Sequence, residues 1–394
     1  MRVKSISVNN FRNLSPAKIT PDGGLNLILG DNAQGKTNLL ESVCLCCLGK
    51  SPRTDKEREM INYDADFARV NIEFTSRYGS ADIAVVLSKK RKKAVAVNSV
   101  PILKIGELLG YLNAVYFSPD EIRVIRMSPA DRRRFLDVDL CQADRNYYYS
   151  LVKYNKILNQ RNNLIKKSRD IETLKEMLFV WDAQLARECA RIVTKRARFC
   201  DRLKALAADA HKRLTDGKES LEISYVTQIE GENAEEREKS AALLLSGSVE
   251  KDFDLGYTTS GCQRDDLKFC VNGADIRSFG SQGQQRTAAL SLKLAELEIF
   301  KELTGDYPVL LLDDVLSELD LSRQKRLLDF CDKVQIILTA THIDEELIRG
   351  REYAEFRLKI RRRANMLKTR STGQPAGCGA VRQSLRGSTA CRIR

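Results

Sequence analysis

The stretch that decides the fold reads Gly30-Asp31-Asn32-Ala33-Gln34-Gly35-Lys36-Thr37. Its spacing is G-x-x-x-x-G-K-[ST], which is typical of a phosphate-binding loop. An apolar run from Leu25 to Leu29 precedes it, and a helical pattern runs from Lys36 to about Leu48. Because strand, loop and helix are the context that this pattern requires, we predict an α/β fold built around a nucleotide site.

The chemistry expected of this loop follows from its residue types. Glycines let backbone N–H groups turn toward phosphate oxygens at the amino end of a helix, where the helix dipole favours anions. Lys36 would reach the β- and γ-phosphates, and the Thr37 hydroxyl would ligate Mg²⁺. All eight residues from Gly30 to Thr37 are therefore candidate ligands of ATP, with Mg²⁺ as the accompanying ion. An accidental glycine turn is the weaker alternative.

A second element is the apolar run from Val309 to Leu312, which ends in two carboxylates, Asp313 and Asp314. A buried strand would deliver Asp313 beside the nucleotide, where it would hold Mg²⁺ together with Thr37. Asp314 would orient or polarise the attacking water. We therefore predict hydrolysis, with Lys36, Asp313 and Asp314 as the catalytic residues. The alternative is a pair of acidic residues that only end a strand.

Two polar loops complete the set. They read Ser281-Gln282-Gly283-Gln284-Gln285-Arg286, at the start of a helix, and Ser317-Glu318-Leu319-Asp320, just after the double carboxylate. A polar loop at a helix amino terminus is a second phosphate-seeking element, and a single fold rarely needs two for one nucleotide. The economical arrangement is a dimer in which Ser281, Gly283 and Gln284 of each chain close over the ATP of the other. A simple helix cap is the alternative.

The periodicity of apolar residues in the rest of the chain changes along its length. Short alternating strands fill the first third, and from about residue 120 to residue 211 the pattern is helical. There, two amphipathic stripes flank the polar break at 166–170, which predicts a short antiparallel helical hairpin packed by its own apolar residues. Asn272-Gly273 predicts a tight hairpin turn before a strand from Ala274 to Phe279. Strand–helix–strand then resumes.

These patterns predict an ATPase head that is split in two by sequence. We expect the first part of the head, with an antiparallel β meander, in residues 1–119, and an inserted helical lobe in residues 120–255. The second part of the head would occupy residues 256–360. Residues 361–394 would form a basic, disordered tail, because they are rich in Ser, Thr, Gly and Arg and show no usable period.

Composition sets limits on function. The chain has 394 residues, of which 43% are hydrophobic and 30% charged. No apolar run approaches the ~18 residues of a membrane span, and residues 1–8 read as a strand rather than a secretory signal, so we expect a cytoplasmic protein. The net charge is +13, but residues 361–394 hold nine Lys or Arg and no Asp or Glu, which leaves 57 basic against 53 acidic residues, or +4, elsewhere. Bulk charge is therefore mostly a property of the tail.

The ordered set of motifs resembles the heads of ABC-type ATPases and, within that group, is similar to the RecF family of bacterial recombination and repair proteins. The resemblance runs from about residue 1 to residue 358. Its residues are Asn10-Phe11-Arg12-Asn13, Gly30 to Thr37, Phe117-Ser118-Pro119-Asp120, Arg132 to Asp137, Gly261 to Asp266, Ser281 to Arg286 and Leu311 to Asp320.

This resemblance implies an ABC-type head with a helical second lobe, and a homodimer that forms with ATP on DNA. It implies weak, DNA-stimulated ATPase activity, association with the nucleoid, and a role in replication restart and the SOS response. It also implies work with RecO and RecR that helps RecA onto gapped DNA. The chain departs from the family pattern at Cys262-Gln263, where Pro-His is usual, and at Asp314, where most ABC ATPases carry glutamate. His342 could be a switch histidine or a surface residue at a strand end.

Two basic clusters are candidates for backbone contact with duplex DNA. One is Lys89-Lys90-Arg91-Lys92-Lys93 at a predicted turn, with a solvated charged turn as the alternative. The other comprises Arg123, Arg126, Arg132, Arg133 and Arg134, for which pairing with Asp131, Asp137 and Asp139 is the competitor.

Two other function classes remain as alternatives. A motor subunit of a membrane transporter would need a tighter arrangement of motifs with an identifiable glutamine loop. An SMC-type structural ATPase would need arms of hundreds of heptad residues.

Overall fold

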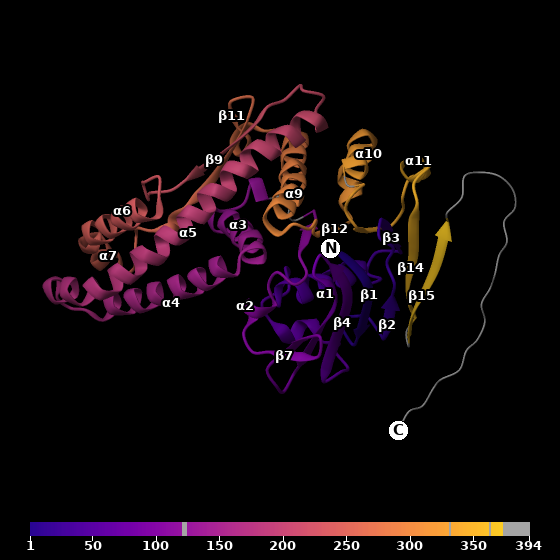
Figure 1. Cartoon of the computed structure of the whole chain (residues 1–394), viewed down its shortest axis with the longest axis horizontal. Coiled ribbons are helices and arrows are strands. Elements are labelled where there is room, and N and C mark those ends of the chain that lie inside the picture. The colour runs from indigo at the N-terminus through magenta and orange to yellow at the C-terminus, as the bar shows by residue number, and fades with distance from the viewer. Residues whose placement is uncertain (120–123, 331, 362–363, 373–394) are drawn as a thin grey trace, which may run out of the picture.

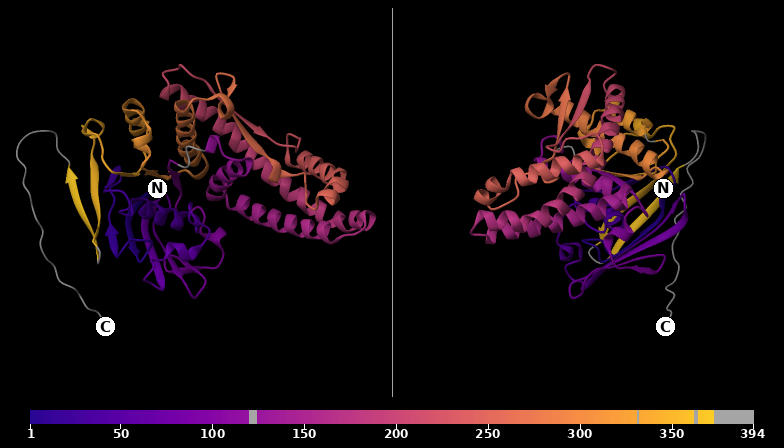
Figure 2. Two further views of the ribbon diagram at one scale, coloured as in Figure 1. Left: turned by 180° about the vertical axis from the view of Figure 1, so that it is seen from behind. Right: turned by 60° about the vertical axis from the view of Figure 1, so that its left-hand side comes forward.

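The computed structural model describes residues 1–119, 124–330, 332–361 and 364–372. Two six-stranded sheets form a head, and an elongated helical lobe projects from it (Figure 1). Figure 2 shows the same arrangement from behind, with the lobe at one end of the molecule and strands β14 and β15 at the other. The predicted fold class, an α/β head with an inserted helical lobe, is confirmed.

The first sheet is the predicted antiparallel meander, with strand order β2-β1-β4-β5-β6-β7. In β4 and β5, buried and more exposed side chains alternate, because one face of this sheet packs inward. Asn98 and Ser99, in the turn before Val100, both have positive φ, as a tight type I′ hairpin requires. The strands are β1 (Arg2–Asn9), β2 (Ala17–Ile19), β4 (Phe67–Ser76), β5 (Gly79–Ser88), β6 (Ala94–Val97) and β7 (Val100–Ile102).

The second sheet has the order β15-β14-β3-β13-β12-β8, and its strands other than β15 run parallel. Its central strands β12 and β13 are buried along their whole length, so their residues form apolar runs rather than alternating ones. Helix α1 (Lys36–Leu48) fills the space between the two sheets and shares a core with both. The strands are β3 (Leu25–Leu29), β8 (Ala114–Phe117), β12 (Val309–Asp313), β13 (Ile336–Ala340), β14 (Tyr353–Arg361) and β15 (Ala364–Thr372).

The helical lobe is built on an antiparallel pair, α4 (Arg145–Lys167) and α5 (Ile171–Leu214). Asp170 lies in the predicted polar break, and its side chain accepts a hydrogen bond from the Thr173 backbone N–H at the start of α5. Three further helices belong to the lobe: α3 (Pro129–Ala143), α6 (Ala234–Gly247) and α7 (Val249–Leu255). Helix α6 occupies a stretch for which the sequence gives no clear pattern.

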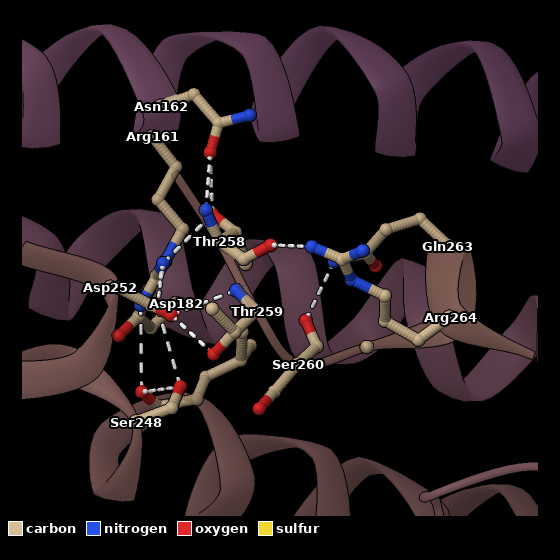
Figure 3. A network of polar contacts seen from close by, with 12 residues as sticks. Arg161, Asn162, Asp182, Ser248, Asp252, Thr258, Thr259, Ser260, Gln263 and Arg264 are labelled. Atoms are coloured by element: carbon tan, nitrogen blue, oxygen red, sulfur yellow. Dashed lines mark hydrogen bonds and ion pairs between the residues drawn. The ribbon is translucent and has the colours of Figure 1, made fainter. Parts of the chain in front are cut away.

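The lobe is fixed by a buried charged network as well as by its apolar stripe (Figure 3). Arg161 of α4 is fully buried and donates to Asp182 of α5 (2.7 Å) and to Asp252 of α7 (2.5 Å). The same guanidinium donates to Thr258 Oγ1 at 2.8 Å. Because a buried guanidinium without partners would be strongly destabilising, this network holds α7 and the chain after it against the hairpin.

A small sheet of order β11-β10-β9 links the lobe to the loop from Ser281 to Arg286, which we call the signature loop. Strand β9 (Leu221–Val226) pairs with β10 (Asp266–Val271). The predicted domain boundary at 255/256 therefore assigns two paired strands of this sheet to different domains. Asn272 and Gly273 form the predicted turn, with φ of 52° and 78°. The predicted strand to Phe279 is wrong: β11 covers only Ala274–Asp275, since the Asp275 side chain caps α8 (Ile276–Phe279).

The remaining elements surround the second sheet. Helix α9 (Gln282–Thr304) packs against α5 and begins directly after Ser281, whose side chain caps it. The others are η1 (Glu57–Met60), α2 (Ile105–Leu108), η3 (Cys262–Arg264), η4 (Val315–Glu318), α10 (Leu321–Phe330) and α11 (Glu345–Ile348).

At the carboxyl end, the sequence predicts disorder from residue 361. The structure instead continues β14 to Arg361 and adds β15 from Ala364 to Thr372, antiparallel to β14. The rest of the predicted tail, residues 373–394, lies outside the described residues. Among the helices that the structure describes, none is long and apolar enough to cross a membrane.

Candidate nucleotide-binding site

The phosphate loop adopts a conformation that depends on its glycines. Gly35 has φ of +87°, and a Cβ there would lie 2.7 Å from both Asn13 Oδ1 and Leu14 Cδ2. A Cβ on Gly30 would lie 2.7 Å from the Leu358 backbone oxygen. Gly35 also precedes α1 without any side-chain cap, so the first backbone N–H groups of this helix remain available to an anion.

Lys36 lies folded over the loop that precedes it. Its Nζ donates to the backbone oxygens of Gly30 (2.5 Å) and Asp31 (3.0 Å), and the residue is only 7% exposed. The ammonium group is therefore held at the centre of the loop, where it can exchange these carbonyl contacts for phosphate oxygens. The part of Lys36 in holding the β- and γ-phosphates stays a prediction.

The loop and the acidic strand meet at Thr37 and Asp313. Thr37 Oγ1 donates to Asp313 Oδ1 at 3.0 Å, and Thr339 Oγ1 donates to the same oxygen at 2.7 Å. Tyr116 OH donates to Asp313 Oδ2 at 3.0 Å; burial, followed by the Asp313 carboxylate, raises the pKa of Tyr116. A hydroxyl and a carboxylate are oxygen ligands of the kind Mg²⁺ prefers, so Thr37 and Asp313 fit a magnesium site.

Asp314 differs from its neighbour in geometry and in charge. It has a positive φ of 53°, and its backbone N–H donates to the Thr339 carbonyl and hydroxyl oxygens, both at 3.1 Å. Partial burial raises the pKa of Asp314; Asp313 and Glu318 add to this rise, and Lys36 opposes it. A carboxylate whose proton affinity is raised in this way suits acceptance of a proton from water.

These elements enclose a cavity of about 340 Å³. Its lining includes Asn13, Asn38 and Arg53, three polar residues that lie outside the predicted set of ligands and catalytic residues. Arg53 Nη1 donates to Asn38 Oδ1 (2.8 Å) and to Glu41 Oε2 (3.2 Å). Glu41 is fully buried and also takes a bidentate pair from Arg12. Asn13 belongs to the motif Asn10 to Asn13, so the sequence offered a signal for this residue. No sequence pattern indicates Arg53.

The predicted signature residues lie elsewhere on this chain. Ser281 is exposed and caps α9 through a capping box with Gln284: its Oγ accepts from Gln284 N at 3.2 Å, and its N–H donates to Gln284 Oε1 at 2.9 Å. Among the described residues, the lining of the phosphate-loop cavity includes Asp313 and Asp314 but not Ser281, Gly283 or Gln284. One chain therefore brings together the loop and the carboxylates and leaves the signature loop apart.

The basic clusters are partly engaged within the chain. In the first, Lys90 pairs with Asp66 and Lys93 with Glu57, while Arg91 and Lys92 are exposed. In the second, Arg132 forms a bidentate pair with Asp266 of β10 rather than with a predicted acidic partner. Arg133 donates to the Asp265 backbone oxygen, Arg126 and Arg134 are exposed, and Arg123 lies outside the described residues.

The structure also places three other residues named from the sequence: Cys262, Gln263 and His342. Cys262 is buried, and its carbonyl oxygen accepts from Arg196 Nη1 at 2.8 Å. Gln263 accepts a hydrogen bond from Tyr154. His342 is exposed and lines a cavity of about 720 Å³ that Gly30 and Asp31 also line.

The fold and site define a P-loop ATPase, and a family model described as an AAA domain matches residues 5–328. The chain is 43% identical over 345 residues to the DNA replication and repair protein RecF of Lachnoclostridium phytofermentans, with 88% of this chain and 94% of that protein covered. It is 42% identical over 360 residues to RecF of Clostridium novyi, with coverage of 91% and 97%. The chain belongs to the RecF family, as the resemblance implied.

Solved structures agree with this assignment. A structure of the recombination mediator protein RecF-ATP in the RecFOR pathway matches with a TM-score of 0.84 and 35% identity, covering 93% of this chain and 97% of that one. The Smc head domain of Pyrococcus furiosus matches with a TM-score of 0.57 at 17% identity, which shows a shared fold alone. Membership of the RecF family favours a DNA replication and repair ATPase over the transporter and structural alternatives.

Proposed function

We propose that this chain is an ATP-gated clamp on duplex DNA. ATP bound at the phosphate loop of one copy would be completed by Ser281, Gly283 and Gln284 of a second copy, so that the nucleotide joins two chains. Closure of the dimer would bring basic surfaces of both copies onto the duplex, and hydrolysis would release them. DNA stimulation and a slow rate would suit a switch rather than a metabolic enzyme.

The observation that carries this proposal is the separation of the signature loop from the nucleotide cavity. The phosphate loop and Asp313 are already in contact at 3.0 Å, while Ser281 is exposed at the start of α9 and outside the cavity lining. To reach the nucleotide of its own chain, the signature loop would have to move into the cavity lining. A second copy would supply the missing side without such a movement.

The chain's own residues suggest how such a site would work. Thr37 and Asp313 would hold Mg²⁺, which would neutralise phosphate charge when bound. Lys36 would leave the carbonyl oxygens of Gly30 and Asp31 for the phosphates, which keeps a cation at the loop in both states. Asp314 would orient water and accept its proton, because its pKa is raised by partial burial and by its acidic neighbours.

The ATP requirement of the clamp can be bounded. To move a closed dimer from 1% to 99% of molecules, ATP must favour it by about 5.5 kcal/mol. Triphosphate charge shared between two chains can supply such a difference, whereas a diphosphate lacks the bridging group.

The partners follow from the family. A solved relative is described as a recombination mediator of the RecFOR pathway, which supports joint action with RecO and RecR and, through them, assistance to RecA at gapped DNA. Exposed Arg91, Lys92, Arg126 and Arg134 are the side chains that we propose for contact with DNA phosphates. Such contacts carry no sequence information, so gaps would be found through partners or DNA shape. We place the protein in the cytoplasm, at the nucleoid.

The test is the mass of the protein by light scattering with ATP, with ADP and with neither, each with and without a duplex. We expect dimers with ATP, and monomers with ADP or without nucleotide. Lys36→Arg should remain monomeric, and Ser281→Arg should bind ATP yet remain monomeric. Ser246→Arg, an exposed change on α6, is the matched control and should dimerise normally. A Ser281→Arg protein that dimerises like the wild type would overturn the composite site.

A further inference from the structure

The signature loop is held from the side by a residue that no motif contains. Gln284 Nε2 donates to Glu219 Oε1 at 3.1 Å, and Glu219 lies in the short segment between α5 and β9. The other end of the same amide, Gln284 Oε1, accepts from the Ser281 backbone N–H at 2.9 Å. The orientation of Ser281 is therefore connected to Glu219 through one side chain.

Behind Glu219 lies a buried histidine. His211, in the last turn of α5, is fully buried, and its Nε2 lies 3.3 Å from Glu219 Oε2. Its Nδ1 lies 3.0 Å from Ser291 Oγ on α9. Within the part of the chain that the structure describes, neither His211 Nε2 nor Glu219 Oε2 makes a hydrogen bond, so their 3.3 Å approach is an electrostatic contact.

The protonation of this pair follows from its surroundings. Burial lowers the pKa of His211; the Glu219 carboxylate opposes this shift, and Arg323 of α10 adds to it. The Ser291 hydroxyl donates its proton to the Thr287 backbone oxygen at 2.7 Å, so in the 3.0 Å contact its oxygen accepts from Nδ1–H of His211. The Nε2 side of the ring then faces the Glu219 carboxylate, and His211 lies directly behind this carboxylate beneath the signature loop.

The same end of α5 is anchored to the ATPase head at other points. Arg326 of α10, which follows the Ser317-to-Asp320 loop, donates twice to the Asp216 carboxylate, at 2.7 Å each, and once to the Arg213 backbone oxygen at 2.7 Å. Arg202 of α5 pairs with Glu302 of α9. Helix α5 has 44 residues and is about 66 Å long at 1.5 Å per residue, so it connects these anchors to the outer end of the lobe (Figure 1).

We infer that Glu219, backed by His211, is a positioning residue for the signature loop: it fixes Gln284 and Ser281 for the nucleotide of a second copy and thereby ties α5 to the closure of the dimer. This inference rests on the composite site proposed above. It adds that the helical lobe and the signature loop move as one unit, because the carboxylate that joins them follows the lobe's longest helix and lies against His211 in the last turn of that helix.

The test compares three variants by the ATP concentration that gives half-maximal dimerisation in light scattering. Glu219→Ala removes the acceptor of Gln284 and should raise this concentration about tenfold, the effect of losing one hydrogen bond to a charged group. Glu219→Gln should behave like the wild type, because its oxygen still accepts from Gln284 and its NH₂ can donate to His211 Nε2. Glu222→Ala, an exposed change on β9, is the matched control.

A charge exchange gives a second, independent arm. Gln284→Glu places two carboxylates side by side and should impair dimerisation at least as much as Glu219→Ala. Adding Glu219→Gln to Gln284→Glu restores one donor and one acceptor at this contact and should recover most of the loss. ATP binding by the monomer, measured with the Ser281→Arg background, should be unchanged by Glu219→Ala.

The outcomes separate the two ideas. If the wild type stays monomeric with ATP, the composite site fails and this inference fails with it. If the wild type dimerises, Ser281→Arg does not, and Glu219→Ala dimerises at the wild-type ATP concentration, then the composite site survives and the positioning role is refuted. Equal impairment by Glu219→Ala and Glu219→Gln would also refute it, since the amide preserves the contact to Gln284.

Discussion

Thr37 and Asp313 are 276 residues apart in sequence, yet the Thr37 hydroxyl donates to the Asp313 carboxylate at 3.0 Å. Strands β3 and β12 both pair in parallel with β13, so their carboxyl ends lie at the same edge of one sheet. Loops at that edge are where open α/β sheets bind ligands. The contact therefore joins the two halves of the head at the point where Mg²⁺ is expected.

The first prediction concerns the hydroxyl groups around Asp313. Tyr116→Phe removes one of its three donors and should raise the Mg²⁺ concentration needed for half-maximal hydrolysis about fivefold, in keeping with ~1 kcal/mol for one hydrogen bond. Asp313→Asn should lower the hydrolysis rate about 100-fold or more, because several kcal/mol of charge stabilisation depend on the metal. Magnesium titrations of ATP hydrolysis measure both. Equal behaviour of the two variants would contradict the assignment of Asp313 as the ligand and Tyr116 as its support.

The second prediction uses the raised pKa of Asp314. A carboxyl whose pKa is higher in the folded than in the unfolded protein stabilises the fold below its unfolded pKa and loses this contribution as pH rises through the folded value. Asp314→Asn should therefore raise the melting temperature at pH 7 to 8, and the difference from wild type should shrink toward pH 4. The same variant should lose hydrolysis while it retains ATP binding.

A matched change with the opposite sign checks this argument. Arg326 lowers the pKa of Asp216, so Asp216→Asn should give no gain in melting temperature at neutral pH. If Asp314→Asn melted at or below the wild-type temperature at pH 7 to 8, the charged form of Asp314 would not be the form that destabilises the fold. If Asp314→Asn still hydrolysed ATP, Asp314 would not be the residue that orients the attacking water and accepts its proton.

The third prediction concerns Arg53, which contacts Asn38 and the buried Glu41 at the edge of the cavity. Arg53→Ala removes the one cation besides Lys36 that the described cavity lining contains, and should weaken ATP binding about tenfold with a smaller effect on the hydrolysis rate at saturation. Fluorescent ATP-analogue binding and steady-state hydrolysis separate these effects. Arg91→Ala, an exposed change outside the cavity, is the control and should bind ATP normally.

The parts of the site that sequence could predict are those whose contacts depend on local pattern. The spacing from Gly30 to Thr37 specifies a loop, and the buried run before Asp313 specifies where a strand must end. Arg53 and Tyr116 could not be found in this way, because their contacts depend on how the loop after α1 folds back onto that helix and on how β8 pairs with β12. Their neighbours in sequence carry no pattern that indicates the direction of the side chain.

The same distinction explains the fold. Apolar content and the preceding loop predict α1, which is buried on nearly all sides. Apolar periodicity predicts the hairpin of α4 and α5, because each of these helices buries a stripe. It fails after Gly273, where the Asp275 side chain caps a helix within a stretch that reads as a strand. It also gives no sign of the Arg161 network, since a buried arginine in a helical pattern reads as an exposed one until its partners from α5 and α7 are known.

The fourth prediction tests that network as a source of stability. Asp252 is fully buried and accepts from Arg161, while Ser248 and Thr259 also donate to it. Asp252→Ala should lower the free energy of unfolding by about 3 kcal/mol, because removing one partner leaves a buried guanidinium with less compensation. Urea unfolding followed by circular dichroism measures the change.

The control for this prediction is the exposed pair Arg187–Glu238 at 3.5 Å, which joins α5 to α6. Glu238→Ala should cost no more than about 0.5 kcal/mol, since surface ion pairs contribute little. A smaller loss for Asp252→Ala than for Glu238→Ala would mean that Asp182 alone satisfies Arg161. In that case α7 would be held by its apolar contacts, through Val249 and Phe253, rather than by charge.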